Sequence, residues 1–599
     1  MTTGFRQLGV VMVVGLVMSA IGLALPPAPA LGADQPALMP KPVSLILTDG
    51  QFTITPATKV LYAKDDVHLA DAAAYLAQRL SRAFDKRVTA KTTGAAEPPA
   101  GTIFITTAGA DAALGDEGYS LTVTAKGVVI RAPKAAGAFY GAITLLQLAP
   151  PDAFRGQALV EDKLGGKLTK PAPRPCDEPN YSAAKPVDSL AVPCATVTDK
   201  PRFAWRGLLI DMALHFWTID ELKAYVDYMA MHKLNSLQLH LTDNENWCAE
   251  VMKYPSLTPE KAKNAANPKL LADQTYYKLA RHYYTQEELK SLVAYAAGRF
   301  VNIVPEFEMP GHCGALMWAN LGCGCTVDGK QAGGVEVCPG NEHTYEVLQG
   351  ILDEMVDIFP SRYIHIGADE CAKENWPKCS ECQKRMTAEG LKNVTELHGY
   401  FVGRMSEYLK KKGRTLVGWD EILESGAKAG AVGMYWRSGT ADKLIANASQ
   451  NRQFLVMTPT AHCYFDFVQS PDKNEPLGYG LQKPWAARKI ITLKTAYELN
   501  PIPADVAKVD PKLSLGVQAN LWGERMKSFP HVLYMTYPRA CALSEIAWSP
   551  DGPRDYAEFF KRLQTHLRRL DAAGIKYRTP TEIDQPGTTS QPAAPGRPK

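Results

Sequence analysis

The sequence has little net charge for its length. Its 66 basic and 62 acidic residues leave a formal charge of +4 over 599 residues, and no stretch gathers basic side chains into a stripe. Proteins that bind nucleic acids need such a stripe, because contacts with phosphates dominate their affinity. The composition therefore argues against a nucleic-acid partner. The length predicts two or more domains, or one large barrel with an attached module.

Long apolar runs are also scarce. Only the segment from Leu8 to Leu25 approaches the roughly 20 residues that a helix needs to span a bilayer. Arg6 precedes this segment, and a Pro/Ala-rich stretch with the pattern Ala28-x-Ala30 follows it. This order is typical of a secretory signal peptide, and the Pro/Ala-rich exit favours cleavage over a membrane anchor. The sequence predicts a signal peptide over residues 1–33 and an exported protein, periplasmic or secreted, with no stable membrane span.

The twelve cysteines lack an obvious metal-ligand spacing. The one Cys-x-x-Cys, at Cys379 and Cys382, has no second such pair and no His-x-His set to complete a zinc site. Disulfides are common in exported proteins, and Cys176 and Cys194 bracket a Pro-rich insertion as a natural pair. The sequence therefore predicts disulfides that staple loops, and neither a metal site nor a cofactor. Two further groups of cysteines lie around two loops, and their connectivity stays open: Cys313, Cys323, Cys325 and Cys338, and then Cys371, Cys379 and Cys382.

Residues 34–200 are predicted to form a small α/β domain. Its Pro-rich stretch, residues 160–200, is interpreted as an inserted loop and a linker. The expected strands are Val43–Leu47, Thr102–Thr106, Tyr119–Val123 and Val128–Ala132, and the expected helices are His68–Phe84 and Ala135–Leu148.

Residues 201–578 show a different rhythm, in which eight strand patterns are mostly separated by helical ones. Such alternation predicts a (β/α)8 barrel. A doubly wound open sheet is the alternative, but no Gly-rich phosphate loop follows any strand. The tail, residues 579–599, is rich in Pro, Gly, Ser and Thr and is predicted to be disordered. The expected strands are Gly207–Asp211, Ser236–Leu241, Val301–Phe307, Tyr363–Gly367, Thr415–Trp419, Ala431–Trp436, Phe454–Thr458 and Ser514–Trp522, and the clearest helices are Ile219–His232, Gln286–Arg299, His343–Phe359, Val394–Lys412 and Tyr556–Ala573.

The fourth of these strands ends in two adjacent carboxylates, Asp369 and Glu370. Neighbouring like charges raise the pKa of one partner, so one carboxyl can stay protonated while the other is ionised. Gly367 and Ala368, just before them, are small enough to let another group approach the backbone closely. A solvated strand end is the alternative explanation of the pair.

Polar and aromatic residues also follow the other strands of the predicted barrel. Because the active site of such a barrel gathers at the carboxyl ends of its strands, these residues are expected to converge. Taken singly, each has an ordinary explanation as a core tryptophan, a structural histidine or a helix cap. Together, aromatic walls and a few carboxylates suit a sugar, whose C–H faces stack on rings and whose hydroxyls need acceptors. They are Asp243, His312, Trp419, Trp436, Tyr464, Asp466, Trp522 and Glu524.

Motifs spread over residues 203–550 resemble those of the family 20 glycoside hydrolases, the β-N-acetylhexosaminidases. The resemblance also extends to the small α/β domain that precedes such barrels. The motifs, in order, are Trp205-Arg206-Gly207, the Asp243 loop, Pro310-Gly311-His312, His365-Ile366-Gly367-Ala368-Asp369-Glu370, Gly418-Trp419-Asp420-Glu421, Tyr464-Phe465-Asp466, Leu521-Trp522-Gly523-Glu524 and the segment from Tyr537 to Trp548.

The resemblance implies a substrate-assisted, retaining hydrolysis of an N-acetylated oligosaccharide or glycoconjugate, an exception to the two-carboxylate scheme. Glu370 would protonate the departing oxygen and then activate water, and Asp369 would hold the acetamido N–H of the sugar. Asp243 and His312 would orient Glu370, and Tyr464 would hydrogen-bond the acetamido oxygen. The remaining positions would bind the sugar: Trp419, Trp436 and Trp522 as walls, and Asp466 and Glu524 as acceptors of its hydroxyls.

One position departs from the family pattern. Leu214 stands where the family has an arginine that holds the 3- and 4-hydroxyls of the sugar, and Arg206 or Arg437 would have to replace it. One alternative is therefore a preference for a sugar substituted at the 3- or 4-oxygen. A second alternative is a catalytically weak barrel that binds N-acetylated glycans, and a third is an ordinary two-carboxylate glycosidase. The gluco or galacto preference and the oligomeric state stay open.

Overall fold

The computed structural model describes residues 36–64, 68–95, 97–156, 185–258, 283–425, 430–438, 442–472, 475–476, 478, 490–526 and 528–587. The predicted signal peptide and Cys176, one half of the expected Cys176–Cys194 pair, lie outside these ranges. Among the described helices, none combines the length and the apolar character that a bilayer crossing requires.

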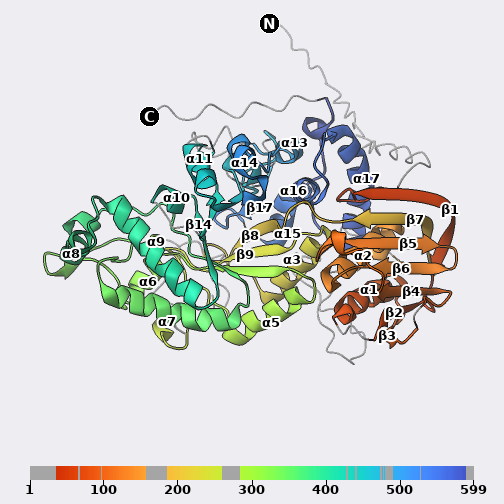
Figure 1. Ribbon diagram of the computed structural model, residues 1–599, viewed down its shortest axis with the longest axis horizontal. Coiled ribbons are helices and arrows are strands. Elements are labelled where there is room, and N and C mark those ends of the chain that lie inside the picture. Colours follow the sequence, from red (N-terminus) through yellow and green to blue (C-terminus); the bar gives the residue numbers. More distant parts are fainter. Residues whose placement is uncertain are drawn as a thin grey trace, which may run out of the picture. The chain divides into compact units, whose positions relative to one another are not determined.

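The N-terminal part of the chain is a seven-stranded mixed sheet in the order β1-β7-β5-β6-β4-β2-β3, drawn in red to yellow in Figure 1. The neighbours β6, β4, β2 and β3 pair in parallel, whereas β1, β7, β5 and β6 pair antiparallel. The strands are β1 (Ser44–Ile54), β2 (Lys59–Ala63), β3 (Ala90–Thr93), β4 (Thr102–Thr106), β5 (Tyr119–Thr124), β6 (Gly127–Arg131) and β7 (Leu190–Asp199).

Strand β7 corrects one prediction, because the sequence places Leu190–Asp199 in the linker and its inserted loop. The strand instead lies between β1 and β5 in the sheet. The sequence argued against a strand here because of Pro193, since proline cannot donate a ladder hydrogen bond and is confined to sheet edges and bulges. Pro193 lies opposite Gln51, where the register of β1 shifts and the ladder is already interrupted.

Two helices, α1 (Leu69–Phe84) and α2 (Ala135–Leu148), accompany this sheet. Every residue from Gly137 to Leu148 is buried, as expected of a helix that is apolar all round and covered on all sides. Its polar groups reach barrel residues: Arg206 donates to the hydroxyl of Tyr140 at 3.1 Å, and Gln147 donates to the backbone carbonyl of Met231 at 3.4 Å. The sheet domain and the barrel are therefore joined through α2.

One buried and one partly buried ion pair add to this junction. Lys233 Nζ lies 2.8 Å from Asp199 Oδ2, and both side chains are at most 2% exposed. The indole N–H of Trp548 donates to the same carboxylate at 3.0 Å. Arg206, fully buried, lies 2.6 Å from Glu117. Breaking a buried pair by removing one partner costs about 3–5 kcal/mol, because the other charge stays desolvated and unpaired.

The rest of the chain confirms the predicted (β/α)8 barrel. Eight strands close in the order β8-β9-β10-β13-β14-β15-β16-β17, and all neighbours pair in parallel. Their buried apolar runs are typical of strands covered on both faces. The strands are β8 (Trp205–Asp211), β9 (Ser236–His240), β10 (Asn302–Glu306), β13 (Tyr363–His365), β14 (Thr415–Trp419), β15 (Val432–Tyr435), β16 (Phe454–Met457) and β17 (Ser514–Leu521).

Helices follow the barrel strands, and Figure 1 shows several of them along its outside. Two begin with a capping box, Thr218 with Glu221 and Thr285 with Glu288, which satisfies amides that the first turn leaves unpaired. The helices are α3 (Ile219–Met231), α5 (Gln286–Ala297), α6 (Gly314–Trp318), α7 (Glu342–Ile358), α8 (Ser380–Glu389), α9 (Val394–Lys411), α10 (Glu421–Glu424), α11 (Asp442–Gln450), α12 (Thr460–Cys463), α13 (Leu493–Tyr497), α14 (Ala504–Val509), α15 (Phe529–Thr536), α16 (Arg539–Trp548) and α17 (Tyr556–Ala573).

Two further predictions need correction. The cysteines of the described ranges are all buried free thiols, so the expected loop-stapling disulfides do not form among them. The tail does not begin at residue 579, because Glu582–Asp584 forms a 3-10 turn. Asp584 in this turn is fully buried and lies 2.6 Å from the Arg578 guanidinium. This ion pair fixes the chain as far as Asp584. Residues 588–599 lie outside the described part.

Candidate active site

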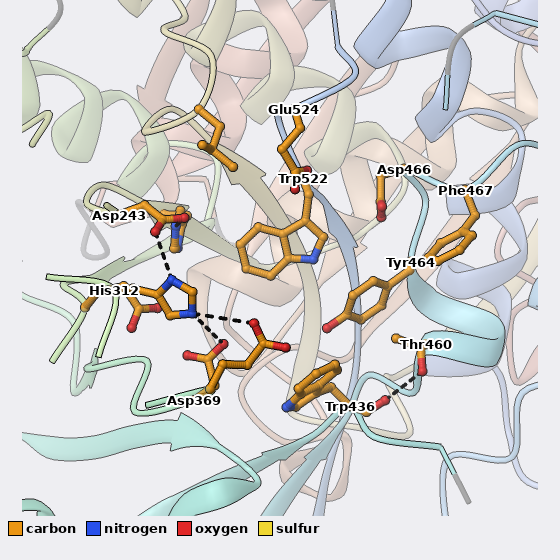
Figure 2. A pocket seen from close by; sticks show the side chains of 14 residues that line it. Asp243, His312, Asp369, Trp436, Thr460, Tyr464, Asp466, Phe467, Trp522 and Glu524 are labelled. Atoms are coloured by element: carbon orange, nitrogen blue, oxygen red, sulfur yellow. Dashed lines mark hydrogen bonds and ion pairs between the residues drawn. The ribbon is translucent and has the colours of Figure 1, made fainter. Parts of the chain in front are cut away.

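A cavity of about 290 Å³ opens at the carboxyl ends of the barrel strands. This volume is close to the lower limit of small-molecule sites, about 300–1,000 Å³, and suits one sugar ring. Figure 2 shows the side chains that converge on it. They lie at the ends of seven of the eight strands or in the segments that follow them: Leu214, His240, Asp243, Glu308, His312, Asp369, Glu370, Trp436, Thr460, Tyr464, Asp466, Phe467, Trp522 and Glu524.

The chain leaves β13 in an unusual conformation that presents both carboxylates. Gly367, Ala368 and Glu370 have φ values of 61°, 70° and 45°. For residues other than glycine this left-handed region is costly, and such strain concentrates at functional sites. Gly367 is required for a second reason, because a Cβ there would lie 1.9 Å from the Glu308 carboxylate. The close approach expected at Gly367 is that of Glu308.

The imidazole of His312 lies between Asp243 and the two carboxylates (Figure 2). Its Nδ1 is 3.0 Å from Asp243, and its Nε2 is 3.9 Å from Asp369 and 3.7 Å from Glu370. Burial opposes a charge on this ring, but hydrogen bonds to Asp243 and Glu370 raise the pKa of His312 to about 11. His312 is therefore an imidazolium at neutral pH and can bind an anion on either side.

The two adjacent carboxyls differ in environment, as the sequence indicated. The one that holds its proton more strongly is Asp369, however, and not Glu370, the acid that the family resemblance implies. The Asp369 side chain is 15% exposed and that of Glu370 60%. Burial raises the pKa of Asp369 to about 6, although His312 opposes the shift. The hydrogen bond from His312 lowers the pKa of Glu370 below its ordinary value. In these surroundings the proton therefore prefers Asp369 to Glu370.

A buried hydrogen-bond network beneath the cavity was missed as a functional feature. Glu306, fully buried, lies 2.8 Å from His240 and 3.0 Å from His365. His240 in turn lies 3.5 Å from Asp243. Burial opposes the charge of His240, but Glu306 and Asp243 raise its pKa well above the ordinary value. The signal was the pattern Pro305-Glu306-Phe307-Glu308, in which two carboxylates interrupt a buried strand.

Four rings form the aromatic side of the cavity: Trp436, Tyr464, Phe467 and Trp522 (Figure 2). The rings of Trp436 and Tyr464 are nearly parallel, with centroids 6.2 Å apart. Trp419, predicted as a further wall, is absent from the cavity lining among the described residues. It is 1% exposed, and its indole N–H donates to Glu306 at 3.0 Å, so it supports the site from below.

Acidic side chains line the cavity opposite the Asp369–Glu370 pair. Asp466 is 2% exposed, and burial together with nearby Glu524 raises its pKa well above the ordinary value. Leu214 also lines the cavity, and no arginine or lysine is among the described lining residues. Asp211 fixes the loop that carries Leu214, because its carboxylate accepts hydrogen bonds from the amides of Leu214 at 3.0 Å and Gly523 at 2.8 Å.

Neither arginine suggested as a substitute for the family arginine is in the cavity lining. Arg206 is fully buried against Glu117 at the junction with the sheet domain, which excludes it from the site. Arg437 binds Asp420 at 2.5 Å and lies 3.3 Å from Glu424. The position of Leu214 is therefore apolar without a basic replacement among the described lining residues.

Comparison with known proteins agrees with this geometry. The family model "Glycosyl hydrolase family 20, catalytic domain" matches residues 203–551, and "Glycosyl hydrolase family 20, domain 2" matches residues 35–200. A beta-hexosaminidase of Porphyromonas gingivalis is 33% identical over 92% of this chain, which spans 65% of that relative. A beta-hexosaminidase of Akkermansia muciniphila is 33% identical over 75% of this chain and 83% of its own length.

Solved structures show the same likeness. An exo beta-N-acetylglucosaminidase of Vibrio harveyi, in complex with N-acetylglucosamine, superposes with a TM-score of 0.73 at 26% identity. The match covers 91% of this chain and 78% of that structure, so it includes both the barrel and the preceding sheet domain.

Proposed function

Because the chain belongs to glycoside hydrolase family 20 and is a glycoside hydrolase of the beta-hexosaminidase type, we propose that it removes β-linked N-acetylhexosamine by substrate-assisted, retaining hydrolysis. The observation that carries the mechanism is the pairing of Asp369 with Glu370 beside His312, across the cavity from Tyr464. A buried carboxyl group and an exposed one at the same strand end can act on two different atoms of one sugar.

In the first step, the acetamido oxygen of the bound sugar attacks its own anomeric carbon. The bond from that carbon to the glycosidic oxygen breaks, and Glu370 gives its proton to the departing oxygen. The product is a cyclic oxazolinium ion whose positive charge Asp369 stabilises through the acetamido N–H. In the second step, Glu370 takes a proton from water, which attacks the anomeric carbon and reopens the ring with retention of configuration.

The same contacts explain how Glu370 obtains its proton. Before substrate binds, solvent and His312 favour its charged form, so binding must reverse this preference. A sugar ring seated over Glu370 removes water from a side chain that is 60% exposed. Desolvation raises the pKa of a carboxyl. Substrate binding thus moves the shared proton from Asp369 to Glu370. Asp369 is then ionised and can stabilise the oxazolinium intermediate.

The remaining lining residues support an N-acetylated sugar as substrate. Trp436, Tyr464 and Trp522 offer aromatic faces for its C–H groups, and Asp466 and Glu524 offer acceptors for its hydroxyls. The Vibrio harveyi structure that superposes on this chain holds N-acetylglucosamine. The alternative of a catalytically weak, glycan-binding barrel is not favoured, because the catalytic groups converge and the relatives are named beta-hexosaminidases. We also propose export, on the strength of the N-terminal apolar segment.

Two aryl glycosides with the same leaving group test the mechanism. The β-N-acetylglucosaminide should be hydrolysed, and the β-glucoside, which lacks the acetamido group, should be nearly inert. A thiazoline mimic of the oxazolinium intermediate should inhibit competitively. Comparable rates on both glycosides, or no inhibition by the thiazoline, would instead support a two-carboxylate mechanism with an enzymatic nucleophile.

A further inference from the structure

Four buried cysteine sulfurs meet beside the active-site loops. The distances between Sγ atoms are 3.8 Å from Cys325 to Cys382, 3.6 Å from Cys338 to Cys379 and 3.5 Å from Cys338 to Cys382. All four sulfurs lie within 4.8 Å of one another, and each side chain is at most 3% exposed. These four residues are called the cysteine tetrad below.

The spacing matches a tetrahedral metal site and not a pair of disulfides. Ligands about 2.3 Å from a tetrahedral zinc ion are about 3.8 Å from each other, whereas bonded sulfurs are about 2.05 Å apart. Cys338 is also nearly equidistant from Cys379 and Cys382, so the tetrad does not divide into two exclusive pairs. From these distances we propose that the tetrad binds one zinc ion.

The local backbone is built around these sulfurs. Cys379 and Cys382 lie at the start of α8, where the helix dipole favours negative charge such as that of thiolates. The amide of Gly340 donates to the Cys338 sulfur. A Cβ on Gly340 would lie 2.3 Å from the Cys382 amide nitrogen, so only glycine lets the two segments meet. The backbone of the two segments therefore already places Cys338, Cys379 and Cys382 close together.

The surroundings indicate a structural ion. Trp376 and Leu397, both fully buried, pack on the tetrad, which has four protein ligands and no open position for water or substrate. Closed sites of four thiolates are typical of structural zinc. The sequence favours disulfides over zinc, because the two halves of the tetrad lie in different loops and only one has the Cys-x-x-Cys spacing.

The proposed ion joins two loops that carry the catalytic residues. Cys325 and Cys338 lie in the connection from β10 to β13, which also holds His312. Cys379 and Cys382 lie in the connection from β13 to β14, which holds Asp369 and Glu370. The Val337 amide donates to the Pro310 carbonyl at 2.9 Å, and the Trp376 indole donates to the Val337 carbonyl at 3.0 Å. Zinc would thus hold His312 in register with the two carboxylates.

The test is the metal content of the full chain, expressed with its own N-terminal segment and dialysed without chelator. Elemental analysis by inductively coupled plasma mass spectrometry should find one zinc ion per chain. Replacement of zinc by Co²⁺ should give the visible absorption of a tetrahedral cobalt tetrathiolate. A chain without zinc overturns the proposal, whether the intact mass reports disulfides or four free thiols.

Substitutions locate the ion and its effect. Cys379→Ser and Cys382→Ser should each lose most of the zinc and lower the unfolding temperature. Cys323→Ser is the matched control, because Cys323 is buried in the same loop as Cys325 but lies outside the tetrad, and it should keep the zinc. Zinc that persists in both tetrad variants would lie elsewhere, for example at His232, Cys541 and His566, and would overturn the assignment.

Discussion

The carboxylate of Glu308 lies directly against the backbone of Gly367, so closely that a Cβ there would be 1.9 Å from Oε2. Burial and the nearby charge of Asp369 raise the pKa of Glu308 well above its ordinary value. Glu308 is thus a neutral, buried acid that fills the space beneath the turn that presents Asp369. The glycine at position 367 leaves the space that the Glu308 side chain occupies, and the placement of the Asp369–Glu370 pair depends on this fit.

Gly367→Ala should therefore inactivate the enzyme and destabilise the fold. Alanine at φ 61° costs about 1 kcal/mol, and collision with Glu308 adds about 1–3 kcal/mol of overpacking. Gly390→Ala is the matched control, since Gly390 has φ 66° and an added Cβ there would meet no atom within 4 Å. Denaturant midpoints and activity should separate the two variants. Equal losses in both would mean that only the backbone conformation matters.

Glu370→Gln should slow hydrolysis according to the leaving group. A general acid contributes about 10²–10⁴-fold, so glycosides with poor leaving groups should lose a factor of this size. An activated aryl glycoside needs little protonation and should lose much less in kcat/KM. Glu374→Gln, an exposed glutamate in the same loop, should leave both rates unchanged. Equal losses on both substrates would remove Glu370 from the acid role.

The pH profile should depend on the substrate, because the proposed mechanism requires a charged Asp369 and a protonated Glu370. Asp369 loses its charge as the pH falls through about 6. With an activated aryl glycoside, kcat/KM should thus rise through about pH 6 to a plateau. With a poor leaving group, it should fall above about pH 6, because the pair then loses its one shared proton.

Asp369→Asn removes the titrating group and supplies the control for this profile. In that variant the rise of kcat/KM through about pH 6 with the activated substrate should disappear, at a much lower rate overall. Persistence of the rise would assign it to another group, such as Glu245, whose pKa burial raises to about 6.

Leu214→Arg should increase kcat/KM on a simple terminal N-acetylglucosaminide. A guanidinium at this point of the cavity can donate charge-assisted hydrogen bonds to sugar hydroxyls, each worth about 1.5–3 kcal/mol. A gain of tenfold or more follows from one such bond. Leu214→Met, apolar and of similar size, is the control and should change little. A wild type as fast as the arginine variant would show that recognition does not need a cation here.

The barrel could be predicted from the sequence because its strands are short apolar runs that alternate with helical patterns, and polar or aromatic residues stand at their carboxyl ends. The strand from Thr415 to Trp419 has the same bounds in the structure. The depth of a side chain below the cavity could not be predicted. Trp419 and Trp436 each end an expected strand, yet only Trp436 lines the cavity. Trp419 is the last residue of β14 and donates its indole N–H to the buried Glu306, whereas Trp436 lies just beyond the end of β15.

The order of the two carboxyl pKa values could not be predicted either. Adjacent positions show that the environments differ, but not which side chain faces solvent. The exposed fraction of Glu370 and its positive φ are properties of the folded chain, and its contact with His312 crosses between two loops. The cysteine tetrad could not be predicted for the same reason, since its two halves lie in segments that are far apart in the sequence. Pairs formed across the barrel rim need the fold before they can be identified.

The buried pair of Lys233 with Asp199 decides how this protein can be divided. The lysine belongs to the barrel and the aspartate to the last strand of the sheet domain. A truncated chain that begins at Phe203 would lack Asp199 and Tyr119, to which Lys233 donates, and would separate Arg206 from Glu117. It would also lose the apolar helix α2, which is buried at this junction. The barrel is therefore not a portable catalytic module. Gene fusions and engineering should carry both parts, and recombination between relatives should be tolerated only where both ion pairs are exchanged together.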